Sequence, residues 1–491
     1  MPPSSSRGGP ERTVASPGAV LAVLSLAAFM ASLDLFIVNV AFHAIGQDFS
    51  GASLSDLSWI LNAYAIAYAA LLVPLGRLAD RYGRKAGFLA GLAVFTLASA
   101  ACAVAPDLWT LVAFRTLQAA GAALLTPTSL GLLLHAMPAE RRARAVRVWA
   151  ATGALAAAAG PVVGGLLVAA SWRWVFLVNI PIGLLALGLA ARVVPESRDP
   201  QPGPIPDLLG AALLACAIGA VALGLVEAPS WGWLSARTLG VLAVAAAAMA
   251  LFWRRSQHHR APVVEPLLLR VRSFAWSNAT ALVFGVAFAG NLLVNILWMQ
   301  QVWHYSALRT GLGVAPGPLM VPVFAAVAQS VAHRIPVGRI AATGCLLLGG
   351  GLALSVLLLG RDPAYVTQLL PCSLVGGAGV GLALPTILSA ATADLPPARA
   401  ATGSAIVNMS RQVGTVLGVS ILVALFGAPV GYAAVHGAFD HVRWALLLAC
   451  GLAAGSAVGM TPRTARVAEL SASASGPAST HTGEHEASAA G

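Results

Sequence analysis

The sequence predicts an all-α integral membrane protein with fourteen transmembrane helices. Of its 491 residues, 58% are hydrophobic and only 10% are charged, which is too apolar for a surface that meets water everywhere. Long apolar runs recur along nearly the whole chain, and roughly 20 helical residues cross the ~30 Å hydrocarbon core with every backbone hydrogen bond made internally. The predicted spans are 18–42, 57–75, 86–105, 108–134, 145–169, 174–194, 207–227, 234–253, 274–299, 310–332, 339–359, 364–391, 402–426 and 441–460.

The basic residues give these helices an orientation. If the N-terminus is cytoplasmic, the inner segments hold 22 of the 29 Lys and Arg residues, the outer loops hold five, and two lie inside spans. Cytoplasmic segments of membrane proteins carry such an excess of positive charge. We therefore expect a multi-pass protein of the cell membrane with both termini in the cytoplasm, and no nucleic-acid partner despite the net charge of +11. The five outer residues are Arg173, Arg237, Arg309, Arg361 and Arg443, and the two inside spans are Arg115 and Arg411.

Two polar breaks divide the chain. PESRDPQPGPIPD (195–207) is rich in proline, and RRSQHHRAPVVEPLLLRVRS (254–273) is the longest internal polar connection. They isolate the seventh and eighth spans and leave six spans on either side, which is the number expected for a transporter built from two duplicated halves. We expect a cytoplasmic tail over 1–17, a six-helix bundle over 18–199, two inserted helices with cytoplasmic linkers over 200–272, a second six-helix bundle over 273–461 and a disordered cytoplasmic tail over 462–491.

Signals for catalysis, cofactors and metals are missing from the sequence. The five cysteines lie within apolar spans without paired spacing, so neither a disulfide framework nor a zinc site is indicated. His481 and His485 of the C-terminal tail are better explained as solvated residues than as metal ligands. No glycine-rich phosphate loop is present, which argues against an enzyme or an ATP-driven pump and leaves an ion gradient as the energy source.

A charged stretch, GRLADRYGRK (76–85), joins the second and third spans. Inner-face anchoring explains its Arg and Lys residues but neither Asp80 nor the glycines. The pattern resembles the signature loop of the major facilitator superfamily. On that resemblance Gly76 and Gly83 allow tight helix ends, and Asp80 pairs with a nearby Arg and faces a helix N-terminus of the opposite half, where the dipole favours negative charge. The gating loop would then comprise Gly76, Asp80, Arg81, Gly83, Arg84 and Lys85.

Further motifs resemble the fourteen-span drug:proton antiporters of that superfamily. They cover both halves of the chain: LDLFIVNVAFHAI (33–45), FRTLQAAGAALLTP (114–127), AAAAGPVVGG (156–165), WRWVFLVNIPIG (172–183) and ATGSAIVNMSRQVGTVLG (401–418). The resemblance implies the major facilitator fold, two six-helix bundles plus two inserted helices. In the antiporter motif, Pro161 removes a helix hydrogen bond while Gly160, Gly164 and Gly165 permit close backbone approach. The alternative to a functional bend is simple tight packing.

Two charges lie deep inside predicted spans. A charge within hydrocarbon costs at least about 2.5 kcal/mol, so Asp34 and Arg115 need a partner or a water-filled cavity. At 1.5 Å per residue they lie about 13 Å and about 10 Å below the outer edge, which are similar depths. We expect both to face a central cavity, with Asp34 binding the coupled proton, because burial disfavours a charged carboxylate whereas a nearby Arg favours it. A purely structural ion pair is the alternative. Gln118, three residues after Arg115, would line the same cavity.

Several other polar and aromatic residues are candidates for the substrate cavity. Helical spacing places Asn291, Asn295 and Trp298 on one stripe, and Asn408, Arg411 and Gln412 on another; interhelical hydrogen bonding explains such stripes equally well. Tyr64 and Tyr68 share a face that would stack on a flat or cationic ligand or pack in the core. His43, where the family usually has Pro, is either an interfacial residue or a proton carrier. Glu227 is either an outer-interface residue or a cation-recruiting one.

These features predict a proton-coupled antiporter that exports hydrophobic, cationic drug-like compounds by alternating access. A dedicated exporter of one endogenous metabolite or antibiotic is the alternative within the same fold. A non-transporting membrane sensor or assembly partner is the alternative of another class. The expected partners are a small molecule, protons and the lipid bilayer; no cofactor is expected, and the protein is expected to act as a monomer.

Overall fold

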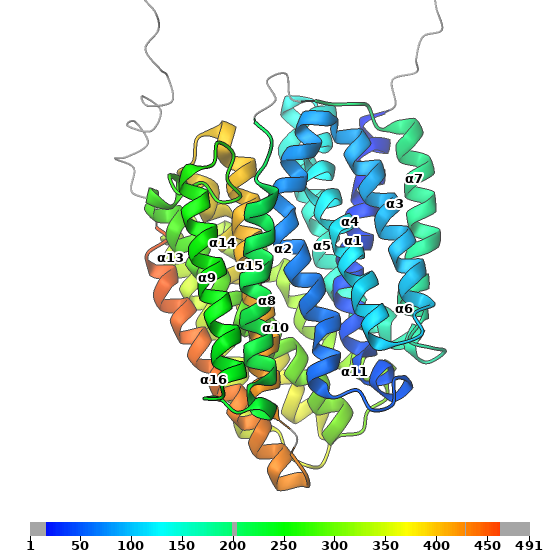
Figure 1. Ribbon diagram of the computed structural model, residues 1–491, viewed down its shortest axis with the longest axis vertical. Coiled ribbons are helices and arrows are strands. Elements are labelled where there is room, and N and C mark those ends of the chain that lie inside the picture. The colour runs from blue at the N-terminus through cyan, green and yellow to red at the C-terminus, as the bar shows by residue number, and fades with distance from the viewer. Residues whose placement is uncertain (1–15, 199–203, 428, 462–491) are drawn as a thin grey trace, which may run out of the picture.

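Helices make up almost the whole ordered structure. The computed structural model describes residues 16–198, 204–427 and 429–461 (Figure 1). Within these residues fourteen helical segments are long and apolar enough to cross a membrane, as predicted. Residues 1–15 of the tail predicted over 1–17, and the whole tail predicted over 462–491 with His481 and His485, lie outside the described residues. The N-terminal group of helices is α1 (Pro17–Asp48), α2 (Leu54–Tyr82), α3 (Arg84–Ala103), α4 (Leu108–Ala136), α5 (Ala139–Val168), α6 (Trp174–Leu177) and α7 (Asn179–Val193).

The remaining helices follow in two groups. Helices α8 (Leu208–Trp231) and α9 (Ala236–His258) form the inserted pair. A short 3₁₀ turn, η1 (Leu268–Arg270), precedes the C-terminal group, and a π-helical segment, η2 (Trp298–Val302), extends its first helix. The C-terminal group is α10 (Arg272–Leu297), α11 (Ala307–Val314), α12 (Pro316–Val331), α13 (Val337–Leu358), α14 (Tyr365–Ala393), α15 (Pro397–Phe426) and α16 (Tyr432–Val458). Helices α6 with α7, and α11 with α12, each make one crossing.

Polar residues cap the first turns of several helices. The second span, predicted over 57–75, begins at Leu54, where Ser53 and Asp56 form a capping box. Asp107 and Ser235 cap α4 and α9, each accepting a hydrogen bond from the backbone three residues on. Of these three helices, only α2 begins before its predicted span, because hydropathy finds the apolar middle of that span but not its polar first turn.

The last span corrects one prediction. It was expected over 441–460, with Arg443, the third residue of that range, counted with the outer loop, but α16 begins at Tyr432 and buries Arg443 completely. The extra turns carry His436 and Asp440, and Asp440 pairs with both His436 and Arg443 along one face of the helix. Charges paired at i,i+3 and i,i+4 spacing allow a helix to continue where hydropathy alone predicts a loop.

The inserted pair packs beside the seam between the two halves. Within the N-terminal half α1 packs on α5 and α3 on α4, and within the C-terminal half α13 packs on α14 and α10 on α15. Helices α2 and α15 contact each other across the halves, and α8 contacts both of them (Figure 1). The inserted helices therefore reinforce one side of the molecule. The residue boundaries predicted for the separate domains stay a prediction.

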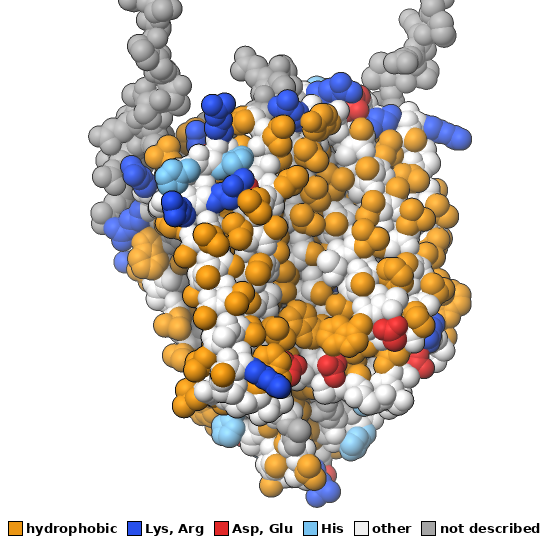
Figure 2. Space-filling view, viewed as in Figure 1, with side chains coloured by type: hydrophobic (Ala, Val, Ile, Leu, Met, Phe, Trp, Pro, Cys, Tyr) orange, Lys and Arg blue, Asp and Glu red, His pale blue; other side chains and the backbone are white. Residues whose placement is uncertain are grey.

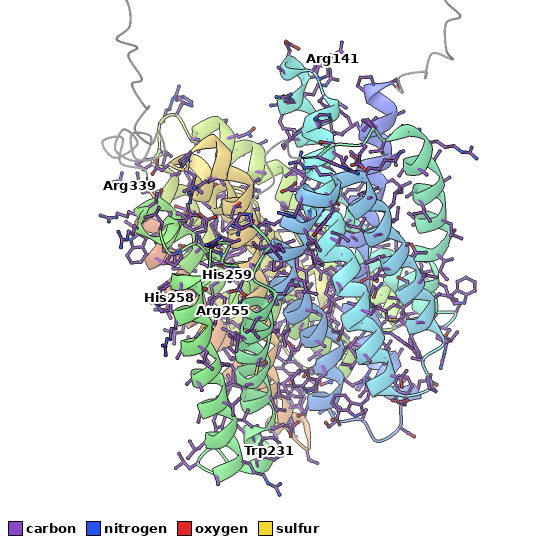
Figure 3. The ribbon with its side chains drawn as sticks, turned by 45° about the horizontal axis from the view of Figure 1, so that its top comes forward. Arg141, Trp231, Arg255, His258, His259 and Arg339 are labelled. Carbon is purple, nitrogen blue, oxygen red and sulfur yellow. The ribbon has the colours of Figure 1, made fainter. Side chains whose placement is uncertain are left out.

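The surface divides into an apolar belt and a basic end. Figure 2 shows hydrophobic side chains over the middle of one face and most of its Lys and Arg side chains at the upper end. The labelled residues of Figure 3 make the same division, because Arg141 and Arg339 lie toward that end and Trp231 toward the other. Helix α1 begins, and α16 ends, at the basic end (Figure 1). This is the charge pattern from which a cytoplasmic face is inferred.

Candidate functional site

A fully buried ion pair lies inside the N-terminal half. Helix α1 supplies Asp34 and α4 supplies Arg115; both are 0% exposed, and Arg115 Nη1 lies 2.5 Å from Asp34 Oδ2. Gln118, one turn further along α4, accepts from Arg115 Nη1 at 2.6 Å and donates to Asp34 Oδ1 at 2.9 Å. The similar depths expected from the sequence correspond to direct contact, and the three residues form a closed ring of hydrogen bonds.

Two further residues of this network were missed by the sequence reasoning. Asn179 donates to Asp34 Oδ1 at 3.0 Å, and Ser99 Oγ accepts from Gln118 at 2.7 Å. Asn179 stands at the break between α6 and α7, within the motif WRWVFLVNIPIG. For Asn179, its place at this helix break is the feature that could have marked it as a site residue, because binding sites in transporters are often built at interrupted helices.

Aromatic rings complete the environment of Arg115. Its guanidinium carbon lies 4.2 Å from the ring centre of Tyr64 and 5.7 Å from that of Phe176. Tyr64 stacks nearly parallel on Tyr68, whose hydroxyl donates to Thr126 at 3.1 Å. The two tyrosines thus share a face as expected, and Tyr64 covers a cation that belongs to the protein. Nε and Nη2 of Arg115 are buried without a hydrogen-bond partner.

The expectation that this pair faces the central cavity is not met in this conformation. Neither Asp34, Arg115 nor Gln118 lines the cavity that lies between the two halves. Their side chains are enclosed by α1, α3, α4 and α7: Gln118 and Asn179 donate to the carboxylate, and Ser99 accepts from both of these amides. Leu35 and Phe36, the residues that follow Asp34, do line it. Helix α1 therefore carries the ion pair on one face and cavity wall on another.

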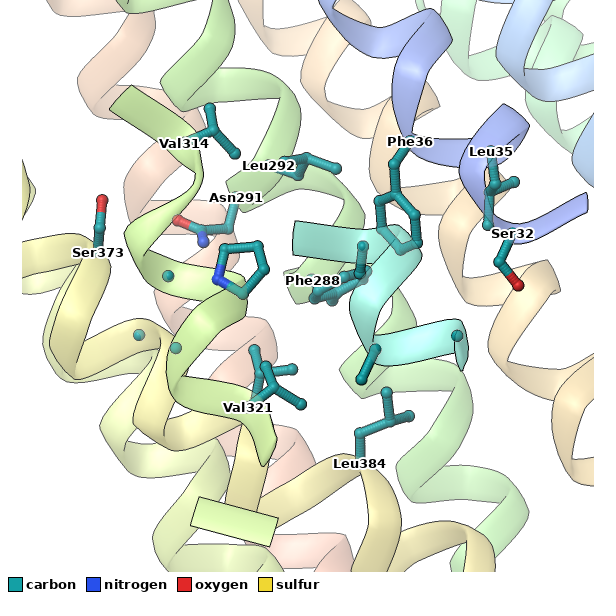
Figure 4. A pocket seen from close by; sticks show the side chains of 18 of the residues that line it. Ser32, Leu35, Phe36, Phe288, Asn291, Leu292, Val314, Val321, Ser373 and Leu384 are labelled. Atoms are coloured by element: carbon teal, nitrogen blue, oxygen red, sulfur yellow. The ribbon is translucent and has the colours of Figure 1, made fainter. Parts of the chain in front are cut away.

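The cavity lies between the two halves and has a volume of about 470 Å³ (Figure 4). This is within the range of small-molecule sites, which run from roughly 300 to 1,000 Å³. Helices α1 and α5 form one wall, and α10, α11, α12, α14 and α15 form the other. Most lining residues are apolar or glycine. The polar and charged ones are Ser32, Asn291, Asn295, Ser373, Asn408 and Arg411.

The two predicted stripes are each split by the structure. Asn291 and Asn295 line the cavity and bond to each other at 3.1 Å, whereas Trp298 is fully buried at the start of η2 and packs on Phe439 of α16. Trp298 is the residue at which the π-helical turn begins, and its ring packs toward α16 instead of the cavity.

In the other stripe, Asn408 and Arg411 line the cavity, whereas Gln412 is buried behind them. Positions 411 and 412 are about 100° apart around an α-helix, so neighbouring residues cannot share one narrow face.

Small residues bring the two halves together toward the end opposite the basic one. Gly160 and Gly164 of α5 lie against Phe36 and Ile37 of α1. A Cβ atom at Gly165 would stand only 2.6 Å from the backbone oxygen of Ala307 in α11, so that position accepts no larger residue without movement. The same helix pair closes again where Gly311 meets the backbone of Pro161. The motif GPVVGG thus packs against both its own half and the opposite one.

The charged loop between α2 and α3 is held mainly within its own half. Gly83, with φ +132°, makes the tight turn, and Gly76 packs against Pro127 of α4. Asp80 pairs with Arg84 at 2.6 Å, and Lys85 Nζ donates to the backbone oxygen of Ala191. Arg81, another basic residue of this stretch, follows Asp80 near the end of α2.

The expected link from Asp80 to the opposite half is replaced by an acidic bridge. Arg77 of α2 pairs with Glu265 at 2.8 Å, and Glu265 also pairs with Arg399 in the first turn of α15. Glu265 belongs to the connection that follows the inserted helices. The Glu265 carboxylate pairs with a guanidinium from each half. The Asp80 carboxylate pairs instead with Arg84, four residues further along in the same half.

The last two candidates lie near the C-terminal ends of their helices, apart from the ion pair and the cavity. His43 is exposed and lies 3.1 Å from Gln47. Glu227, in the last turns of α8, accepts from Ser230 at 3.0 Å. These positions fit interfacial residues. Among the described residues no group of three His, Cys, Asp or Glu side chains is arranged to hold a metal ion.

Comparison with known proteins gives a consistent result. The family model described as Major Facilitator Superfamily matches residues 24–419. The chain is 33% identical to the methylenomycin A resistance protein of Streptomyces coelicolor, covering 91% of each chain. It is 31% identical to a multidrug resistance protein B homolog of Mycobacterium tuberculosis, over 86% of this chain and 79% of that one. It is 32% identical to the tetracenomycin C resistance and export protein of Streptomyces glaucescens, over 88% and 78%.

Solved structures share the fold at low sequence identity. A D-xylose–proton symporter aligns with a TM-score of 0.64 and 15% identity, covering 91% of this chain and 98% of that one. A POT family transporter in complex with a thioalcohol-conjugated peptide aligns with a TM-score of 0.66 and 15% identity, over 88% and 94%.

Proposed function

The chain belongs to the Major Facilitator Superfamily, and on that premise we propose that it is a proton-coupled antiporter that exports hydrophobic drug-like compounds. It works in the cytoplasmic membrane, as a monomer, with its basic face and both termini inside. The relatives named for multidrug and antibiotic resistance support export as the direction of transport. The protein acts as a transporter and catalyses no reaction.

The observation that carries the coupling proposal is the buried pair of Asp34 and Arg115. An intramembrane charge is expensive, and one that is retained marks a functional site by default. A proton bound to Asp34 removes the counter-charge of Arg115 and weakens the hydrogen bonds that Gln118 and Asn179 donate to the carboxylate. Because Asp34 lies directly before the cavity-lining Leu35 and Phe36, this change acts on the cavity wall through α1.

Alternating access requires the two halves to separate on the side that is closed here. In this conformation α5 and α11 are in backbone contact near Gly165 and Gly311. Opening toward the outside breaks that contact and makes the cavity accessible from the outer face. The acidic bridge through Glu265 then takes the role of the cytoplasmic latch that the sequence assigned to Asp80.

A dedicated exporter of one antibiotic is the second candidate. Two of the relatives carry names that refer to a single antibiotic, methylenomycin A and tetracenomycin C. Broad and narrow specificity differ in how many compounds the same cavity accepts, so a transport panel separates them.

The test is efflux from cells that express the chain, with a panel of compounds and a proton uncoupler. The wild type is expected to clear compounds only while the proton gradient is intact, and Asp34→Asn to lose this activity almost completely. Asp362→Asn, the same change at an exposed position of an outer loop, is the matched control and should behave as wild type. Equal clearance by wild type and Asp34→Asn would exclude Asp34 as the coupling site.

A further inference from the structure

The charges that line the central cavity are of one sign only. Of the described residues that form its wall, Arg411 is charged, and none is a carboxylate. The other polar groups are three asparagine amides and two serine hydroxyls. The proposed exporter therefore presents its substrate with one guanidinium and several neutral hydrogen-bonding groups inside an apolar wall.

Arg411 differs from the two other deeply placed arginines. Arg115 pairs with Asp34, and Arg443 pairs with Asp440. No carboxylate in the described part of the chain lies within ion-pair distance of Arg411, and its Nε is buried without a hydrogen-bond partner. Asp34, the buried acid of the N-terminal half, is already engaged by Arg115, Gln118 and Asn179.

An unpaired guanidinium in a low-dielectric cavity needs a partner from outside the protein. Carboxylates match its planar donor geometry and form the strongest hydrogen bonds available to it. A cationic ligand would be repelled, because the cavity offers no carboxylate to offset Arg411. The asparagines beside it, Asn408 on the same helix and Asn291 on α10, supply further amide groups for carbonyl or hydroxyl oxygens.

We propose that the substrate is an organic acid, with an apolar ring body and one anionic group that pairs with Arg411. This inference rests on the proposed export function and specifies its substrate class. It replaces the cation expected from the sequence. The apolar body packs between Phe36 of α1, Phe288 of α10 and the glycines at 376 and 377 of α14, all of which line the cavity.

The sign of the substrate charge has an electrical consequence. Exchange of one entering proton for one leaving monovalent anion moves two positive charges inward in each cycle. Exchange of one proton for one monovalent cation moves none. A membrane potential that is negative inside therefore drives export of the acid even without a pH gradient.

The binding test uses three probes that share one ring system: 2-naphthylacetate, its methyl ester and 2-(2-naphthyl)ethylammonium. Each is titrated calorimetrically into the purified full-length protein. The acid is expected to bind at least tenfold more tightly than the ester or the ammonium compound. Arg411→Gln should abolish this preference, Arg411→Lys should keep part of it, and Arg237→Gln, the same charge loss at an exposed site, should leave it unchanged.

Two results would overturn the inference: tighter binding of the ammonium probe than of the acid by wild type, or undiminished acid preference in Arg411→Gln. If Arg411→Gln does not give a monodisperse protein, the wild-type ranking and Arg411→Lys decide the question. Proteoliposomes then separate this inference from the proposed function. Proton-driven export of cations that is unchanged in Arg411→Gln would refute the acid substrate but support the antiporter function. Acid binding without any proton-driven transport would refute the antiporter function.

Discussion

Each half of the molecule buries one arginine completely, but the two are satisfied in different ways. Arg115 in the N-terminal half and Arg443 in the C-terminal half are both 0% exposed and both use Nη1 for their ion pair, with Nε and Nη2 left without partners. Both also lie over an aromatic ring, Arg115 at 4.2 Å from Tyr64 and Arg443 at 4.4 Å from Trp298.

The difference lies in the carboxylates. Asp34 is fully buried and comes from a different helix, whereas the Asp440 side chain is 26% exposed and lies one turn from Arg443 on the same helix. A pair between two helices changes when the helices move, and a pair within one helix does not. We infer that the first pair responds to the transport cycle and that the second mainly stabilises α16.

The largest expected effect is that of Arg115→Gln, and Arg443→Gln is the comparison for it. Arg115→Gln leaves Asp34 as an uncompensated buried charge, so the free energy of unfolding should fall by about 3–5 kcal/mol. Arg443→Gln leaves Asp440 partly hydrated and beside His436, so the loss should be about 1 kcal/mol or less. Thermal unfolding of the purified variants measures both.

The double variant Asp34→Asn with Arg115→Gln is the control for this comparison. It removes both charges and should recover part of the stability lost in Arg115→Gln. Equal destabilisation by the two single arginine variants would contradict the distinction between the pairs.

An intermediate effect is expected from Asn179→Ala. The change deletes a hydrogen bond to the buried carboxylate of Asp34, which is worth about 1.5–3 kcal/mol for a charged acceptor. Proton-driven export should fall roughly tenfold, and transport assays at fixed pH measure the loss. Asn39→Ala on α1 is the matched control, because Asn39 bonds only to the backbone of its own helix at Leu35. A similar loss in both variants would point to general disruption of the bundle.

The smallest effect is expected from Asp440→Asn. Its pair with Arg443 is long, at 3.2 Å, partly exposed and confined to one helix, so proton-driven export should stay within about twofold of wild type. The same transport assay provides the measurement. Loss of coupling in Asp440→Asn would show that the second pair takes part in the cycle and would remove the contrast drawn between the halves.

Several features of this protein could be predicted from the sequence because they depend on local composition. The crossings follow from apolar length, and the division into two halves from the polar breaks around the inserted helices. The orientation inferred from the placement of Arg stays a prediction. The depths of Asp34 and Arg115 also follow, because the helical rise is constant. The charged loop and the GPVVGG motif were recognisable by resemblance to the family.

Which buried polar groups meet was decided by the tertiary structure alone. In lipid, the outward and inward faces of a helix are both apolar, so hydrophobic periodicity carries little information about which face packs inside. Asn179 reaches Asp34 through the packing of α7, Ser99 of α3 accepts from Asn179, and Trp298 packs on Phe439 of α16 instead of lining the cavity. The isolation of Arg411 depends in the same way on where every carboxylate of the bundle comes to lie, which only the assembled helices determine.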